Sequence, residues 1–189
     1  MIVEKISGIS FKTFMEKNVF IPLGMNSTLV FDQSKSEIKN RTTGFNLVGD
    51  IDDYNAFTTG GGGMYSTTGD LYLWDQALYT DKLIPQTSLN EAFTPLVLND
   101  GTVSNYGYGW MIEYNGQNKS VFHTGGLSGF RTNIYRDLAN HNTVILFTNY
   151  GSSEVLKSLS RSIQLIFTRF SRYNSLVAHF PETVQTLGG

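Results

Sequence analysis

The sequence predicts an α+β fold, a single domain in which helices pack on an antiparallel β-sheet. Three observations support this class. Apolar residues recur at helical spacing in the first 25 residues, the pattern becomes strand-like between residues 106 and 149, and helical spacing returns at 153–170. The 189 residues are enough for one sizeable domain and short for two. We place this domain at residues 1–170 and assign no structure to the tail at 171–189.

Two helices are predicted at the start of the chain. Helical spacing of apolar residues indicates the first over residues 2–6, and Gly8 is placed to end it. Ser10 can cap the second helix, because its hydroxyl can accept from the backbone N–H groups of the first turn. Pro22 and Gly24 are expected to stop that helix.

A long polar connection follows at residues 26–58, with one short strand expected near 28–31. Ser66 is a suitable N-cap for a helix at 67–79, in which apolar residues fall on one stripe. A shorter helix is expected at about 88–93, after a proline.

The second half of the chain predicts a sheet and a final helix. An aromatic strand is expected at 106–114, and Asn115-Gly116 favours a hairpin turn because both positions tolerate a positive φ. Short connections predict antiparallel pairing of three further strands, at 119–124, 130–136 and 143–149. The run Val144–Phe147 is continuously apolar, so we expect that strand to be covered on both faces. The final helix, at 153–170, has an apolar stripe of Leu156, Leu159, Ile163, Phe167 and Phe170.

Composition argues against several classes of function. The net charge is -2 and the pI about 5.9, so no broad basic surface for nucleic acid is expected. No apolar run approaches the ~18 residues that span a bilayer, and the N-terminus lacks the pattern of a signal peptide. The chain has no cysteine, and its three histidines (His123, His141 and His179) are scattered. We therefore expect no metal site, and we expect no cofactor.

Five segments, in their order and spacing, resemble the C-terminal portion of the serine β-lactamase and penicillin-binding-protein superfamily, which includes class C β-lactamase-related esterases and D-alanyl-D-alanine carboxypeptidases. His123–Gly126 matches the third catalytic motif, in the variant with His where Lys is commoner. The other segments are Glu4–Gly8 through Pro22–Met25, Gly61–Leu71, Tyr106–Trp110 and Thr148–Asn149. The match covers about residues 1–168. It implies a partial β-lactamase/transpeptidase-like fold without the N-terminal strands and nucleophile helix.

The resemblance implies acyl transfer, which needs a nucleophile, a base and donors for the developing oxyanion. It implies polar substrate contacts from His123 and Thr124, a close approach of strand and substrate at Gly125, and an oxyanion donor in the backbone N–H of Gly126. Histidine in this motif favours esterase or peptidase members over true β-lactamases. Asn149 is a further candidate, for which a substrate contact and a role in a turn are both open.

The family's Ser-x-x-Lys nucleophile motif and its Tyr-x-Asn motif have no counterpart at a suitable place. The segment from Ser36 to Lys39 satisfies Ser-x-x-Lys literally, but it lies in a polar stretch typical of a solvated loop. Ser128 does not complete a Gly-x-Ser-x-Gly elbow, because Phe130 replaces the last glycine, and a turn is favoured there. Losing a catalytic serine lowers the rate by roughly six orders of magnitude. We therefore expect this chain to be part of a longer hydrolase and inactive alone.

Three other patterns favour a structural role over a functional one. The four glycines at 60–63 lack the Lys-Ser/Thr of a phosphate loop and indicate a close-packed turn. Asp52 and Asp53 are expected to be solvated. The basic face of the last helix is also expected to be solvated; it comprises Lys157, Arg161, Arg169 and Arg172.

The expected ligand is a β-lactam, a D-Ala peptide or a small ester. The alternatives are a noncatalytic module that binds such a ligand and a degenerate fragment without function. Without the family's N-terminal strands, an unpaired strand edge would favour self-association or strand exchange with a partner. The resemblance implies an extracytoplasmic full-length protein, but the location of this chain is left open.

Overall fold

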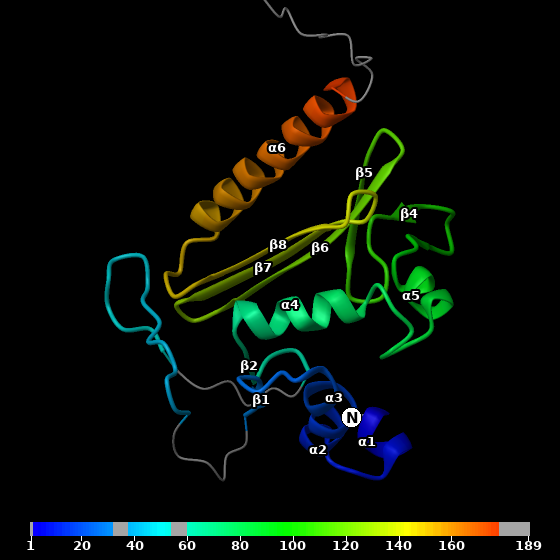
Figure 1. Cartoon of the computed structure of the whole chain (residues 1–189). Coiled ribbons are helices and arrows are strands. Elements are labelled where there is room, and N and C mark those ends of the chain that lie inside the picture. Colours follow the sequence, from blue (N-terminus) through cyan, green and yellow to red (C-terminus); the bar gives the residue numbers. More distant parts are fainter. Residues whose placement is uncertain (1, 32–37, 54–59, 178–189) are drawn as a thin grey trace, which may run out of the picture.

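The computed structural model describes residues 2–31, 38–53 and 60–177, with side chains described to residue 167. Its centre is a four-stranded antiparallel sheet in the order β5-β6-β7-β8 (Figure 1). Helix α6 (Ser153–Val177) lies on one face of this sheet, and helix α4 (Thr68–Ala77) lies on the other. The prediction of helices packed on an antiparallel sheet is confirmed.

The four strands follow one another along the chain in three hairpins. They are β5 (Met111–Asn115), β6 (Asn118–Leu127), β7 (Phe130–Asp137) and β8 (Asn142–Thr148). The hairpin expected at Asn115-Gly116 is present, but its two-residue loop is shifted by one position to Gly116 and Gln117. Gly116 has a φ of 64°, so one position of this loop does require the left-handed conformation.

The strand expected at 106–114 begins later, at Met111. A turn occupies the residues before it, because the backbone N–H of Gly107 donates to the carbonyl of Trp110 at 2.8 Å. Gly109 has a φ of 79°, which an extended strand does not allow. The aromatic pattern of Tyr106–Trp110 therefore belongs mainly to a tight turn; only an isolated bridge joins Tyr106 to Met111.

The N-terminal helices run as one continuous helical stretch from residue 11 to residue 23. Helix α1 (Ile2–Ser7) precedes α2 (Phe11–Met15), a π-helical segment η1 (Glu16–Phe20) and α3 (Ile21–Leu23). Ser10 caps α2 as predicted, because its Oγ accepts from the backbone N–H of Thr13. Pro22 does not stop this stretch, which passes from the π-helical segment η1 into α3 and ends two residues after the proline, at Gly24.

Gly24 ends the helical stretch, with a φ of 71°. The N–H groups of Gly24 and Met25 donate to the carbonyls of Ile21 and Phe20, at 3.1 and 2.9 Å. This is the Schellman pattern, in which a left-handed glycine lets the chain turn back on the last helical carbonyls.

Short elements connect the helical part to the sheet. Strand β1 (Leu29–Val30), expected near 28–31, pairs with β2 (Met64–Tyr65). Helix α4 is capped by Thr67 and not by Ser66, because the Thr67 Oγ1 accepts from the Asp70 N–H at 3.1 Å. Three further elements complete the chain between α4 and β5: α5 (Gln86–Ala92), β3 (Leu96–Val97) and β4 (Val103–Ser104).

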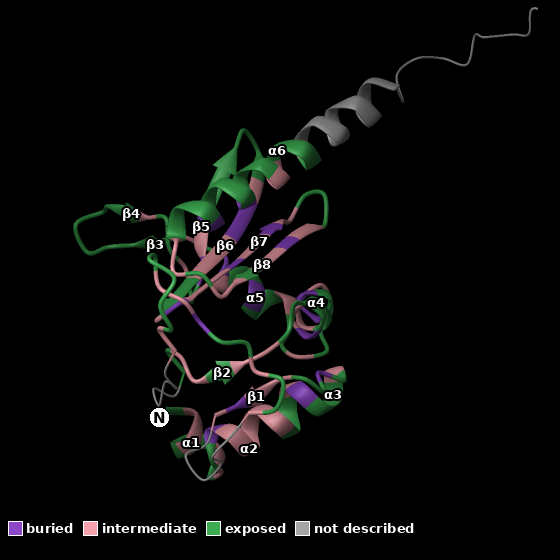
Figure 2. Ribbon diagram, turned by 90° about the vertical axis from the view of Figure 1, so that its left-hand side faces the viewer, coloured by how far each residue is buried: buried purple, intermediate pink, exposed green. Residues whose placement is uncertain are grey.

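Two clusters of buried side chains meet at α4, where Trp74 packs against both. The larger joins the sheet to α4 and α5 and includes Leu78, Leu89, Phe93, Trp110, Ile112 and Val121. The smaller joins the N-terminal helices to β1 and includes Phe11, Phe20, Met25 and Val30. Figure 2 shows that buried residues run along β6 to β8 and recur on α4 and α5.

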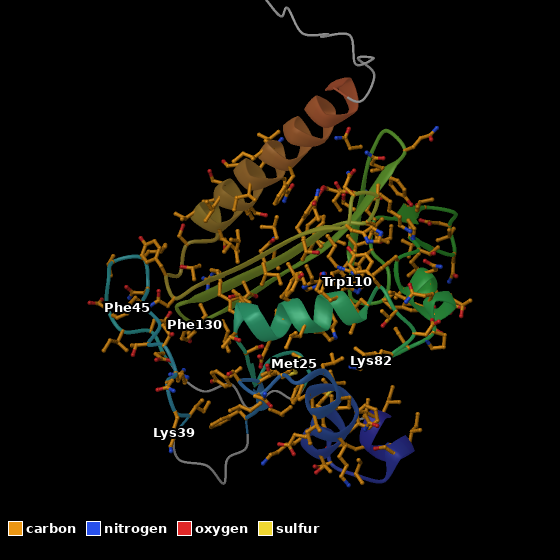
Figure 3. All side chains as sticks on the ribbon, viewed as in Figure 1. Met25, Lys39, Phe45, Lys82, Trp110 and Phe130 are labelled. Atoms are coloured by element: carbon orange, nitrogen blue, oxygen red, sulfur yellow. The ribbon has the colours of Figure 1, made fainter. Side chains whose placement is uncertain are left out.

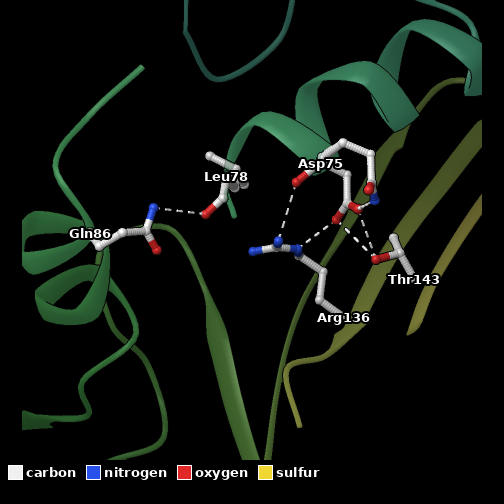
Figure 4. Close-up of polar contacts among 6 residues, drawn as sticks. Asp75, Leu78, Gln86, Arg136 and Thr143 are labelled. Carbon is white, nitrogen blue, oxygen red and sulfur yellow. Dashed lines mark hydrogen bonds and ion pairs between the residues drawn. The ribbon is translucent and has the colours of Figure 1, made fainter. Parts of the chain in front are cut away.

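A buried ion pair ties α4 to the sheet (Figure 4). Arg136 donates from Nε to the Asp75 carboxylate at 2.6 Å, and the Thr143 hydroxyl donates to both carboxylate oxygens at 3.0 Å. The Arg136 guanidinium also lies over the ring of Tyr79, 4.4 Å from its centroid. Asp75 and Arg136 are fully buried, so the sheet and α4 are joined by charge as well as by apolar packing.

Strand β8 has α4 on one face and α6 on the other, as its apolar sequence predicted. Coverage is incomplete, because Phe147 is 38% exposed. On α6, Leu156 is buried, but Leu159 is 50% exposed, contrary to its predicted place on the packed stripe. Ser160 lies against the sheet, where its hydroxyl donates to the Asn133 side chain at 3.3 Å. The face of α6 that packs on the sheet is therefore not the one that its apolar stripe predicted.

In the part of the chain that the structure describes, no helix is both long and apolar enough to cross a membrane.

Candidate functional site

Strand β6 is open along half of one edge. Strand β7 pairs with it from Ser120 to Leu127, whereas the pairing with β5 ends at Phe122. Among the described residues, the segment His123–Leu127 therefore has a partner strand on one side only. This open segment contains the whole His-Thr-Gly-Gly sequence.

The pairing pattern shows which backbone groups face the open edge. The N–H of Leu138 donates to the carbonyl of Lys119 at 3.2 Å, so the polar groups of Lys119 point toward β7. The backbone N–H and C=O groups of successive residues in a strand point alternately to its two sides. Those of His123 and Gly125, which lie an even number of residues from Lys119, therefore also point toward β7. Thr124 and Gly126 then direct their N–H and C=O groups to the open edge. Gly126 is also exposed, so its N–H is accessible to a ligand.

The side chains of His123 and Thr124 leave the strand on opposite faces, as successive strand residues do. His123 lies on the α4 face, where its Nε2 is 3.0 Å from the hydroxyl of Tyr106. Thr124 lies on the α6 face and lines a cavity beneath that helix. The structure thus places both predicted residues beside the open edge, but their side chains serve different faces.

Side chains of β7 approach the two glycines of the motif closely. A Cβ at Gly125 would lie 2.4 Å from the Oγ1 of Thr132 on β7. A Cβ at Gly126 would lie 3.2 Å from the Cδ of Arg131. Glycine therefore lets β7 side chains approach β6 while the edge stays uncovered.

Arg131 is a candidate that the sequence analysis missed. It lies opposite Gly126 on β7, and its guanidinium donates to Ser153 Oγ and to the carbonyls of Ser128 and Phe130. The cavity of about 110 Å3 under α6 is lined by Thr124, Gly125, Gly126, Arg131, Ser153, Leu156 and Lys157. Two cationic side chains, two hydroxyl side chains and the open strand edge therefore meet in one place. The strand pattern placed Arg131 in β7, but only the register brings it to Gly126.

Asn149 contacts a loop of the protein itself. Its side-chain Nδ2 donates to the backbone carbonyl of Thr43 at 2.9 Å, and its backbone carbonyl accepts from the N–H of Phe45 at 2.8 Å. Of the two roles that the sequence left open, these contacts favour the structural one.

The loop at 41–53 packs against the turn that joins β6 to β7, where Figure 3 shows Phe45 beside Phe130. The N–H of Gly129 donates to the carbonyl of Asp52 at 2.8 Å, and Ser128 lies in the turn as predicted, with a φ of 48°. A Cβ at Gly129 would lie 2.2 Å from the backbone nitrogen of Phe45, so only glycine allows this contact.

Asp53, expected to be solvated, instead forms a part-buried ion pair with Arg41. The Arg41 guanidinium lies over the rings of Tyr65 and Phe130, at 5.3 and 5.5 Å from their centroids. One arginine therefore connects the loop to the turn at the end of the open edge. The Ser-x-x-Lys match at Ser36 falls outside the described residues.

Acid is expected to weaken the attachment of this loop. Hydrogen bonding from Arg41 holds the pKa of Asp53 below its ordinary value. The resulting stabilisation is present above the unfolded pKa of about 3.9 and is lost as the pH falls through the lower folded pKa. We expect the free energy of unfolding of the Asp53→Asn variant to depend less on pH below about pH 4 than that of the wild type. Urea titrations at a series of pH values measure this, and equal dependence in both proteins would contradict it.

No group of three or more His, Cys, Asp or Glu side chains that could hold a metal ion occurs within the described ranges.

The basic face of α6 was expected to be solvated. There, Lys157 is exposed and pairs with Glu154 at 3.1 Å, while Arg161 is exposed. The open edge itself offers backbone hydrogen-bonding groups, and positive charge from Arg131 and Lys157 lies beside it.

Known proteins are similar to this chain in sequence and in fold. The family model described as β-lactamase matches residues 1–166. A penicillin-binding protein of Bacillus subtilis (strain 168) is 31% identical over 166 residues, which is 79% of this chain and 37% of that protein. The octameric penicillin-binding protein homologue from Pyrococcus abyssi has a TM-score of 0.67 at 23% identity, over 79% of this chain and 36% of that one. D-amino acid amidase from Ochrobactrum anthropi SV3, complexed with L-phenylalanine amide, has a TM-score of 0.67 at 20% identity, over 92% of this chain and 55% of that one.

Proposed function

The chain belongs to the β-lactamase family, whose members of known structure share its fold, and on that premise we propose that it forms one wall of the substrate cleft of a serine hydrolase. The chain spans about 37% of the length of the curated relative described above. The proposed substrate has an acyl group to transfer and a free carboxylate, as D-Ala peptides and β-lactams do. The alternative substrate is a small ester, which also has an acyl group to transfer.

The observation that carries this proposal is the outward N–H of Gly126 at the open edge of β6. An acyl-transfer site needs donors where the oxyanion develops, and a backbone N–H on a rigid strand is such a donor. Loss of one oxyanion donor typically costs about 2.7–4 kcal/mol in the transition state. The absence of a side chain at Gly126 leaves room for the substrate carbonyl.

Arg131 and Thr124 are proposed to bind the substrate carboxylate. The Thr124 side chain and the Arg131 guanidinium line the same cavity, which opens beside Gly126. Charge-assisted hydrogen bonds to a carboxylate are roughly twice as strong as neutral ones. His123, on the opposite face, would contact the part of the substrate that lies toward α4.

We further propose that this chain hydrolyses nothing by itself. The motif from Ser36 to Lys39 is its literal Ser-x-x-Lys match, and it lies in the polar connection between β1 and β2. Exposure to a fluorescent penicillin is expected to leave the chain unlabelled, as seen by intact mass and in-gel fluorescence. A stable mass increase of one penicillin would contradict this, and peptide mapping would identify the nucleophile. Binding without labelling is what a noncatalytic ligand-binding module would also show.

Ligand binding tests the wall itself. Titration with N-acetyl-D-alanyl-D-alanine is expected to shift the 1H–15N resonances of Thr124 and Gly126. Arg131→Gln is expected to weaken that binding by about tenfold to a hundredfold, because a hydrogen bond to a charged group contributes roughly 1.5–3 kcal/mol. Arg161→Gln, an exposed change on α6, is the control and should bind as the wild type. Absence of shifts at both Thr124 and Gly126 would reject the proposed function.

Self-association is proposed at the outer edge of β8, which has no partner strand among the described residues. On α6, the apolar residues Val155, Leu159 and Ile166 are 57, 50 and 52% exposed and recur at helical spacing. An unpaired edge and an apolar stripe both favour association. The proposal is supported by the octameric state of the Pyrococcus abyssi homologue, whose fold is similar.

Light scattering is expected to show a mass that rises with protein concentration. Leu159→Lys should increase the monomer fraction, because it places a charge in the apolar stripe. Leu165→Lys is the matched control, since Leu165 is 55% exposed but lies roughly 100° around the helix from the centre of the stripe. A wild-type mass that stays monomeric at all concentrations would contradict the prediction.

A further inference from the structure

Tyr106 and His123 form a hydrogen-bonded pair at the cleft wall. The Tyr106 hydroxyl lies 3.0 Å from His123 Nε2, and the two rings meet edge to face with centroids 6.0 Å apart. His123 is half-buried and Tyr106 is 39% exposed. Among the described residues, each is the other's only side-chain hydrogen-bond partner.

The backbone around Tyr106 is held from several directions. Its carbonyl accepts from the N–H of Leu96 at 3.1 Å, and the N–H groups of Gly107 and Tyr108 donate to the carbonyls of Trp110 and Ala92 at 2.8 and 3.0 Å. A Cβ at Gly107 would lie 2.1 Å from the Ala92 carbonyl oxygen. This close contact shows why the turn needs glycine, and it means that the Tyr106 ring is presented by a constrained backbone.

The direction of the hydrogen bond follows from the chemistry of the two groups. A neutral imidazole has one N–H and one nitrogen lone pair, while a phenol can donate or accept. A phenol is a far stronger acid than the N–H of a neutral imidazole, so the bond O–H···N is favoured over N–H···O. The Tyr106 proton has no other acceptor among the described side chains. The phenol therefore donates to Nε2.

We propose that Tyr106 is a positioning residue that fixes the neutral His123 ring as the tautomer protonated at Nδ1. The tautomer of a histidine is set by the hydrogen bond that its other nitrogen makes. Free histidine prefers the opposite tautomer, with the proton on Nε2. Nδ1 then presents a donor to the ligand, and its partner is a carbonyl or carboxylate oxygen. This last step, and only this step, rests on the proposed function.

Nitrogen NMR of the histidine rings tests the tautomer in the free chain. At a pH where the ring is neutral by its shifts, His123 Nε2 in the wild type is expected to resonate as a pyridine-type nitrogen and Nδ1 as a pyrrole-type nitrogen. Tyr106→Phe keeps the ring and removes the hydroxyl, so it should shift Nε2 toward the pyrrole type. Tyr108→Phe is the matched control: its side chain is 70% exposed in the same turn, and it should leave His123 unchanged.

A wild-type His123 with a pyrrole-type Nε2 would overturn the inference, and so would identical shifts in the wild type and the Tyr106→Phe variant. The remaining 1H–15N resonances report whether the variant is folded. With N-acetyl-D-alanyl-D-alanine, Tyr106→Phe is expected to weaken binding about fivefold, the effect of one lost neutral hydrogen bond. A chain that binds no such peptide would refute the proposed function and leave the tautomer result standing.

Discussion

Replacing Asp75 with alanine is expected to lower the free energy of unfolding by about 3–5 kcal/mol, the typical effect of removing one partner of a buried ion pair. Arg136 would remain fully buried without its carboxylate, and the Thr143 hydroxyl would lose its acceptor. Of the guanidinium nitrogens, Nη1 already has no hydrogen-bond partner within the described structure, so little is available to compensate. Urea unfolding followed by tryptophan fluorescence measures the loss.

Two further variants separate the ion pair from a general effect of mutation. Glu91→Ala changes an exposed carboxylate and should alter stability by no more than about 0.5 kcal/mol. The double variant Asp75→Leu with Arg136→Met removes both charges, and it should recover more than half of the loss, because a buried pair is often replaceable by apolar side chains. If Asp75→Ala were as stable as Glu91→Ala, the pair would not hold α4 to the sheet.

The sheet and the helices on its faces could be predicted because the signals are local. The apolar run at Val144–Phe147 and the turn residues before Asn118 suffice to predict consecutive hairpins. The strand at 106–114 was partly wrong for a physical reason: aromatic residues suit a strand and a packed turn alike, and the Gly107 contact with Ala92 is not visible in the local sequence. Pro22 was misjudged because the π-helical segment before it has no local signal in the sequence, and the helical stretch continues past the proline to Leu23.

The sequence predicts where the site lies, but it does not reveal every residue that contributes to it. His123–Gly126 stood out as a motif, and the structure places it at the open edge. Arg131 and Tyr106 were missed as site residues because each reaches the motif through pairing register or a turn. Asp75 and Arg136 lie 61 residues apart, so no local pattern announces their pairing.

Replacing Trp110 with alanine is expected to cost about 3–5 kcal/mol of stability, the usual range for a buried tryptophan. Its ring is 8% exposed and stacks on Trp74 at 6.0 Å, while Phe93 meets it edge-on at 5.5 Å. The cavity left behind would lie between α4, α5 and the start of β5, where the larger core is anchored. Denaturant titration followed by far-UV circular dichroism, which does not depend on the tryptophan signal, measures the effect.

The same substitution should also reach the candidate site, because the Trp110 carbonyl accepts the hydrogen bond that closes the turn after Tyr106. Loss of the anchoring ring should loosen that turn, weaken the contact of Tyr106 with His123 and move the His123 ring nitrogens toward the shifts of the Tyr106→Phe variant. Tyr108→Ala, in the same turn but 70% exposed, should change stability by no more than about 0.5 kcal/mol and leave His123 unaltered. A destabilised Trp110→Ala protein with unchanged His123 shifts would separate the two effects. It would show that the backbone bonds of the turn, and not the packing of Trp110, hold Tyr106 in place.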